Sequence, residues 1–168
     1  MIAKAPHVRL LEKALEVITG LEYEDEAGVA IATVRHRRNR GPNRQERNSI
    51  ILGFVGDDFQ EDDRNRSMAE TVRLLTFTLQ ADIELPTEIS NEDPTGLGQA
   101  SAALRVARAA LTAEDGELLE MCDDITNGSY DPSDDAQPDE GRLVRTGVVV
   151  YRVRTDDPNE LLARSEIP

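Results

Sequence analysis

The sequence predicts an α+β fold, with a mainly antiparallel sheet of about four strands and two helices packed on one face. Two segments repeat apolar residues at helical spacing, one segment alternates apolar and polar residues strictly, and runs of β-branched residues lie between turn signals. The expected order is helix, three strands, helix, strand. The 168 residues hold no internal repeat or linker, so we expect one domain over residues 1–158 and a flexible C-terminal tail over 159–168.

The first helix is expected near the N-terminus. Val8, Leu11, Leu15 and Ile18 recur at helical spacing, and charged residues fall on the other faces. Gly20 is a plausible end, since glycine often terminates helices. An acidic turn over residues 22–28 should follow.

The next two strands are expected to form a long charged hairpin. Residues 29–35 are rich in β-branched side chains, and residues 49–55 form a second apolar run. Between them, Gly41-Pro42-Asn43 is a turn signal. The tip of this hairpin would be the basic segment, Arg35–Arg47.

The clearest strand pattern covers residues 75–85, after a charged loop over residues 56–66. Apolar side chains alternate with polar ones there, which indicates a strand with one solvated face, and Pro86 should end it. Val72 and Leu74 have the opposite parity. If Val72 also belongs to the strand, a bulge or bend is expected near Leu74.

The second half of the chain predicts two helices and a final strand. The alanine-rich residues 99–113 favour a helix after a loop over residues 87–98, and a shorter helical piece is expected after Asp115, with Leu118, Leu119 and Cys122 turned inward. A loop over 129–142 precedes a strand over 143–155. The inward face of the longer helix should consist of Ala103, Val106, Ala107, Ala110 and Leu111.

Charge is distributed unevenly along the chain. The net charge is −14, which argues against ordinary DNA binding, yet the basic segment carries +5 and leaves −19 for the rest. The segment is either a solvated loop or an arm that contacts an acidic surface of a neighbouring subunit. In the second case the candidate interface residues are Arg35, Arg37, Arg38, Arg40, Arg44 and Arg47.

Few residues point to catalysis, metals or cofactors. His7 and His36 are the only histidines, and Cys122 is the only cysteine, which we expect to be a buried apolar residue. The acidic run from Asp57 to Asp63 lacks the spacing of a calcium loop. Gly96–Ser101 matches part of a dinucleotide fingerprint but lies too far from the preceding strand. We therefore expect no enzyme activity, no metal and no cofactor.

The N-terminal region lacks the apolar stretch of a signal peptide, and no apolar run reaches the ~20 residues that cross a membrane. The single cysteine does not indicate an oxidising compartment. The sequence thus favours a protein that stays in the cytoplasm where it is made.

Taken together, the segments resemble the tail terminator, or minor tail, proteins of long-tailed bacteriophages. The resemblance spans Val8 to Pro158: the helix HVRLLEKALEVITGL, a charged β-hairpin, the strand RLLTFTLQADIELP, the helix GLGQASAALRVARAALTAEDGEL and the closing strand GRLVRTGVVVYRVRTDDP. The chain is longer than the smallest members of this family, with extra residues near Pro132 and after Pro158.

This resemblance implies a virion protein of the tail–neck junction, assembled in the bacterial cytoplasm. It would form a homo-hexameric ring on the tail tube, end polymerisation and offer a surface for head–tail joining. Its partners would be itself, the tail tube protein and head connector or neck proteins, with sheath and tape measure proteins as further candidates and no membrane. An acidic bore would let DNA pass without specific binding.

Acidic loops are the candidates for that bore, and plain solvent-exposed loops are the equal alternative. The residues concerned are Asp57, Asp58, Glu61, Asp62, Asp63, Asp131, Asp134 and Asp135.

Two other functions remain open from the sequence. One is another neck or tail-completion connector, which would differ in ring symmetry. The other is a small cytoplasmic enzyme or ligand-binding domain, which predicts a concave polar pocket.

Overall fold

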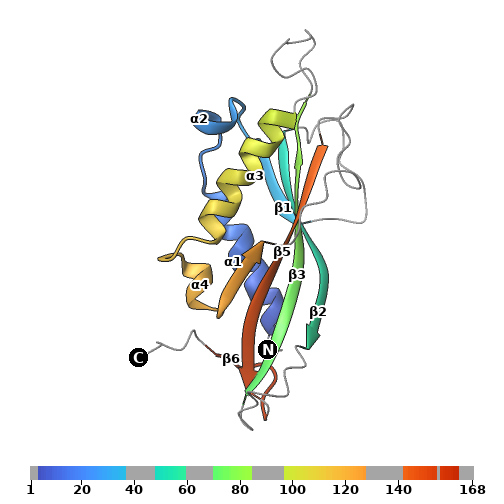
Figure 1. Ribbon diagram of the computed structural model, residues 1–168, viewed down its shortest axis with the longest axis vertical. Helices are drawn as coiled ribbons and strands as arrows, with labels where there is room; N and C mark the ends of the chain where they lie inside the picture. Colours follow the sequence, from blue (N-terminus) through green and yellow to red (C-terminus); the bar gives the residue numbers. More distant parts are fainter. Residues whose placement is uncertain are drawn as a thin grey trace.

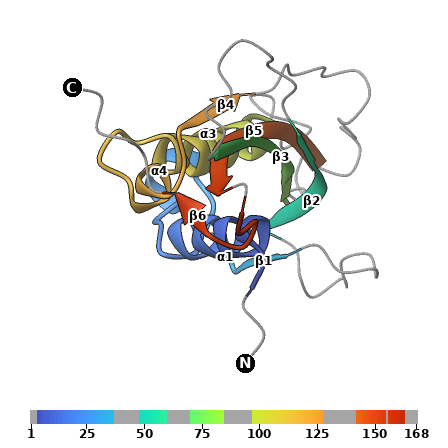
Figure 2. The ribbon, with the colours of Figure 1, turned by 90° about the horizontal axis from the view of Figure 1, so that it is seen from below.

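A computed structural model describes residues 4–36, 48–59, 70–84, 97–127, 142–154 and 156–162. One sheet runs in the order β1-β2-β3-β5-β4, with β6 beside β5. Figure 1 shows the helices on one side of this sheet, and Figure 2 shows the strands forming an arc around them. The α+β class is confirmed. The sheet differs from the prediction because it has six strands and is mixed rather than purely antiparallel.

Helix α1, Pro6–Thr19, begins with proline, whose fixed φ suits the first helical turn. The N–H of Gly20 donates to Glu16 O at its C-terminus, and the hydroxyl of Tyr23 donates to Ile18 O over 2.6 Å. The face that the helix buries is rotated from the predicted one. Pro6, Leu10, Leu11, Ala14 and Ile18 are buried, while Val8 and Leu15 are half-buried.

The expected hairpin is wrong, because strands β1 (Thr33–His36) and β2 (Ser49–Phe59) run parallel. Thr33 pairs with Ser49 and His36 with Leu52. Parallel strands need a connection of about a dozen residues that returns along the sheet, and residues 37–48 supply that length. The turn signal Gly41-Pro42-Asn43 lies outside the described residues.

Strands β3 (Glu70–Asp82) and β5 (Arg142–Arg154) pair antiparallel along their whole length. The expected bulge near Leu74 is wrong, since the register between them is unbroken; the bulge lies in β2 instead. Phe77 faces Gly147, where a Cβ atom would come within 2.4 Å of the phenyl ring. Glycine is therefore required opposite this aromatic ring.

Helix α3, Leu97–Leu111, and the short α4, Glu117–Glu120, confirm the two later helices. Leu118, Leu119 and Cys122 are buried as expected. The buried side of α3 comprises Ala100, Ala103, Leu104, Ala107 and Leu111, so Val106 and Ala110 were placed too centrally. Small alanines let α3 lie close to β3 and β5, while α1 packs on β1 and β2.

Three short elements were not predicted: α2 (Glu24–Ala27), β4 (Asp124–Asn127) and β6 (Leu161–Leu162). They are too short for a period to be recognised. Gly28, at φ 66°, ends α2 in the left-handed conformation that glycine adopts readily. Strand β6 pairs with β5, so Leu161 and Leu162 belong to the sheet rather than to a tail, and residues 163–168 lie outside the described ranges.

One continuous apolar core lies between the helices and the sheet face turned toward them, called the inner face below. Its residues come from every described helix and from four of the strands. Because the alternation of β3 sets the inner face, with Leu75, Phe77, Leu79 and Ala81 all buried, the strand predicted most clearly also organises the core.

Candidate functional site

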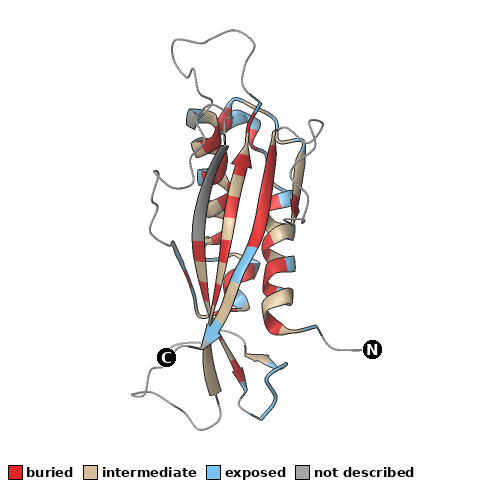
Figure 3. Cartoon of the chain, turned by 90° about the vertical axis from the view of Figure 1, so that its right-hand side faces the viewer, coloured by how far each residue is buried: buried red, intermediate tan, exposed pale blue. Residues whose placement is uncertain are grey.

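A β-bulge at Val55 divides β2 into two parts. Phe54 pairs with Phe77, but the next pair is Gly56 with Thr76, so Val55 is an extra residue. Before the bulge, Ile50 and Leu52 point to the inner face. After it, the parity changes and Asp57, opposite Leu75, points inward. Figure 3 shows β2 passing from a buried to an exposed stretch part way along its length.

The bulge thus brings a carboxylate to the inner face of the sheet. The side chain of Asp57 is only 9% exposed. Tyr151, on β5, donates its hydroxyl to Oδ1 over 2.7 Å. Arg73, on β3, donates from Nε to Oδ1 over 3.2 Å and from Nη2 to Oδ2 over 2.9 Å, and Nη2 also reaches the Asp57 carbonyl oxygen. Three strands therefore meet at one carboxylate.

His7 joins this group from the first turn of α1. Its Nδ1 lies 3.2 Å from Asp57 Oδ2, and its ring stacks on Phe54 with centroids 5.6 Å apart. The partners of His7 are therefore a carboxylate and an aromatic ring. We call His7, Asp57, Arg73 and Tyr151 the Asp57 cluster.

The electrostatics of the Asp57 cluster favour a neutral tyrosine and a charged arginine. Burial, together with the hydrogen bond to Asp57, raises the pKa of Tyr151. Burial alone would lower the pKa of Arg73, but its hydrogen bonds to Asp57 and the carboxylate charge outweigh that effect and raise it. A buried carboxylate needs such compensation, because unpaired buried charge is costly.

Chemically, the cluster contains a histidine beside a carboxylate, an arrangement that can orient an imidazole for general-base catalysis. However, both the arginine and the tyrosine already donate to the same carboxylate. The geometry therefore fits best a structural role, in which the cluster fixes the beginning of α1 to β2, β3 and β5.

Beside the cluster, the surface of β2 is unusual. Among the described residues, the exposed large apolar side chains are Phe54, at 53%, and Val55, at 59%. Asp58, farther along the strand and opposite Leu74, is exposed on the other face of the sheet. Strand β1 pairs only with Ser49–Leu52, so within the described ranges no second strand covers the edge of β2 beyond Leu52.

The predicted site residues are placed as follows. Arg35 is buried, at 8% exposed, with Nη1 donating to His36 O, so it does not belong to an exposed arm. Asp57 lies on the inner face of β2 and Asp58 on its surface, which corrects the expectation that both belong to a loop. Outside the described residues lie Arg37, Arg38, Arg40, Arg44, Arg47, Glu61, Asp62, Asp63, Asp131, Asp134 and Asp135.

Sequence reasoning missed Arg73, Tyr151 and Phe54. Arg73 has the same parity as Leu75 and Phe77, and Tyr151 the same parity as Val149 and Val153. A cation in phase with the apolar face of a strand is a signal for a buried anionic partner, and that signal was present in the sequence.

A second group of ion pairs lies on the other face of the sheet, around Arg152. Arg152 donates from Nε to Asp123 and from Nη1 to Glu70, both over 2.7 Å. Its side chain is 17% exposed, and these bonds and the nearby carboxylate charges raise its pKa despite burial. The group links β5 to the start of β3 and to the residue before β4.

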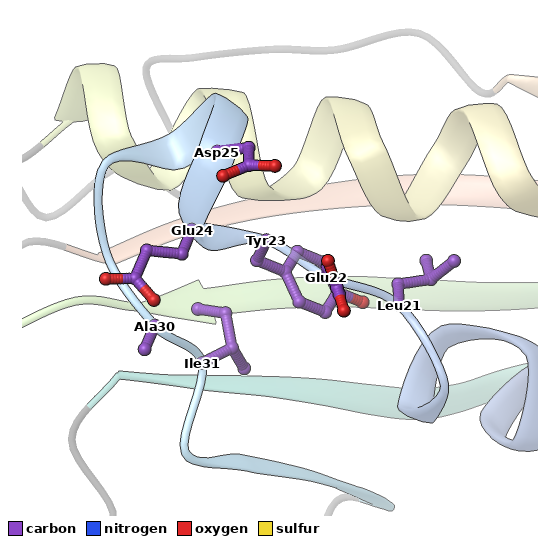
Figure 4. A pocket seen from close by; sticks show the side chains of 7 residues that line it. All are labelled: Leu21, Glu22, Tyr23, Glu24, Asp25, Ala30 and Ile31. Carbon is purple, nitrogen blue, oxygen red and sulfur yellow. The ribbon is translucent and has the colours of Figure 1, made fainter.

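An open pocket of about 370 Å³ lies between α2 and the segment that leads to β1. Figure 4 shows the side chains that line it. Its lining is Leu21, Glu22, Tyr23, Glu24, Asp25, Ala30 and Ile31. The hydroxyl of Tyr23 is already bonded to Ile18 O, and burial raises the pKa of Tyr23. The remaining polar groups are solvent-facing carboxylates, so the pocket presents no convergent set of groups for a ligand.

The cysteine and the glycine-rich motif noted in the sequence do not form a site. Cys122 is buried, with Sγ 3.3 Å from Leu118 O. Of the glycine-rich match, Gly96 lies outside the described residues, and α3 begins at Leu97, far beyond the end of β3 at Asp82. Within the described ranges, no group of three histidine, cysteine or acidic side chains is arranged to hold a metal ion. None of the helices in these ranges is long and apolar enough to cross a membrane.

Comparison of the chain with models of known protein families and with curated proteins finds no match.

Proposed function

We propose that the protein is a structural virion protein, the tail terminator of a long-tailed bacteriophage, which forms a ring on the tail tube and prepares it for joining to the head. The proposal rests on the segments that resemble this family. It is supported by an α+β fold in which one sheet packs against α1, from the beginning of the chain, and α3, from its second half. DNA would pass through the ring without specific binding.

The observation that carries the ring is the separation of charge along β2. The basic segment, at +5, leads into Ser49 at the beginning of β2. Asp58 stands near its end, and three further carboxylates follow within residues 61–63. The 11 residues of β2 span roughly 35 Å at ~3.3 Å each.

Opposite charges at the two ends of one strand favour a head-to-tail contact between copies. Over that span, attraction within one copy is screened, because the Debye length is ~8 Å at physiological salt. A head-to-tail contact between identical subunits closes into a ring when the rotation permits. The remaining arginines of the basic segment, rather than the buried Arg35, are the interface candidates.

The experiment that tests the function uses a phage that lacks this protein. We expect tails of abnormal length that fail to join heads, and purified protein added to tubes of normal length should restore joining, seen by electron microscopy. Tails of normal length with normal joining would remove the terminator assignment and favour a decorative or enzymatic role. Rings of another symmetry at the neck would favour a different connector.

Free protein should be monomeric or weakly associated, because a subunit that closed into rings too readily would cap tails before they were complete. Sedimentation at micromolar concentration measures this. A tight dimer with a large two-fold apolar interface would contradict the ring.

Replacing Arg37, Arg38 and Arg40 by Ala should leave the fold intact and lower the yield of joined particles. Added salt should also lower the yield of joined particles, since it screens the attraction between partly exposed charges. Unchanged joining by this variant would mean that the basic segment is a solvated loop only.

A further inference from the structure

We draw no further inference here: the strongest candidate, the surface patch that Phe54 and Val55 form at the bulge of β2, is an exposed apolar surface beside His7, and nothing in the structure shows what covers it.

Discussion

Ile50 and Leu52, in the first half of β2, and Asp57, in its second half, point to the same inner face of the sheet. The first two are almost completely buried against apolar neighbours. Asp57 is buried against an arginine, a tyrosine and a histidine. One strand thus stabilises the fold by apolar burial at one end and by compensated charge at the other.

The two halves differ in what they demand of their neighbours. Apolar burial is non-directional and contributes ~25 cal/mol per Å², so a close-packed leucine tolerates small shifts. A buried carboxylate depends on donors at particular positions, and removing one partner leaves a costly group behind. The polar half should therefore be the more sensitive to changes that move atoms without removing them.

Asp57→Ala should destabilise the protein by about 3 kcal/mol, because it leaves the Arg73 guanidinium and the Tyr151 hydroxyl without their shared acceptor. Asp58→Ala, one residue away and exposed, should change the free energy of unfolding by no more than about 0.5 kcal/mol. Equal effects in urea titrations would contradict the assignment of Asp57 as the compensated group.

These two halves also explain what the sequence could reveal. Strict alternation identified β3, and its apolar parity predicted the inner face through Leu75, Phe77 and Leu79. Asp57 was instead assigned to a loop because it lies in the charged run that begins at Gly56. Nothing in the sequence marks Val55 as the extra residue that brings Asp57 to the inner face. Parity arguments are reliable only between bulges.

Chain direction was the other failure. Two β-branched runs joined by a turn signal suggested a hairpin, but β1 and β2 are parallel. A local turn signal shows that the chain changes direction between two strands. It does not decide whether the chain changes direction once, which gives antiparallel strands, or twice, which gives parallel ones. The cluster of His7, Asp57, Arg73 and Tyr151 depends on both the bulge and the packing of α1, so its members, far apart in sequence, could not be brought together by local pattern.

Gly147→Ala tests the apolar part of the sheet, where shape rather than charge is decisive. The added Cβ would meet the Phe77 ring at 2.4 Å, and overpacking of this kind costs about 1–3 kcal/mol. Combining it with Phe77→Leu should relieve part of the clash, giving a coupling of about 1 kcal/mol in thermal unfolding. Strictly additive effects would mean that the sheet adjusts elsewhere.

The smallest expected effect is the pH dependence of the Asp57 cluster. Burial raises the pKa of Tyr151 above its ordinary value of 10.0, so the folded state keeps the phenol proton while the unfolded state releases it. Stability from this group is therefore complete below pH 10 and is lost as pH rises further. At pH 11 the loss from one such tyrosine is about 1.4 kcal/mol.

Tyr151→Phe should be less stable at neutral pH by about 1 kcal/mol, the usual value of one hydrogen bond. Its stability should nevertheless fall by about 1.4 kcal/mol less than that of the unmodified protein between pH 8 and 11, in urea titrations at each pH. Tyr23, whose pKa burial also raises, should keep its own share of the fall in both proteins. Identical falls would mean that Tyr151 ionises alike in the folded and unfolded states, contrary to its position at the shared carboxylate.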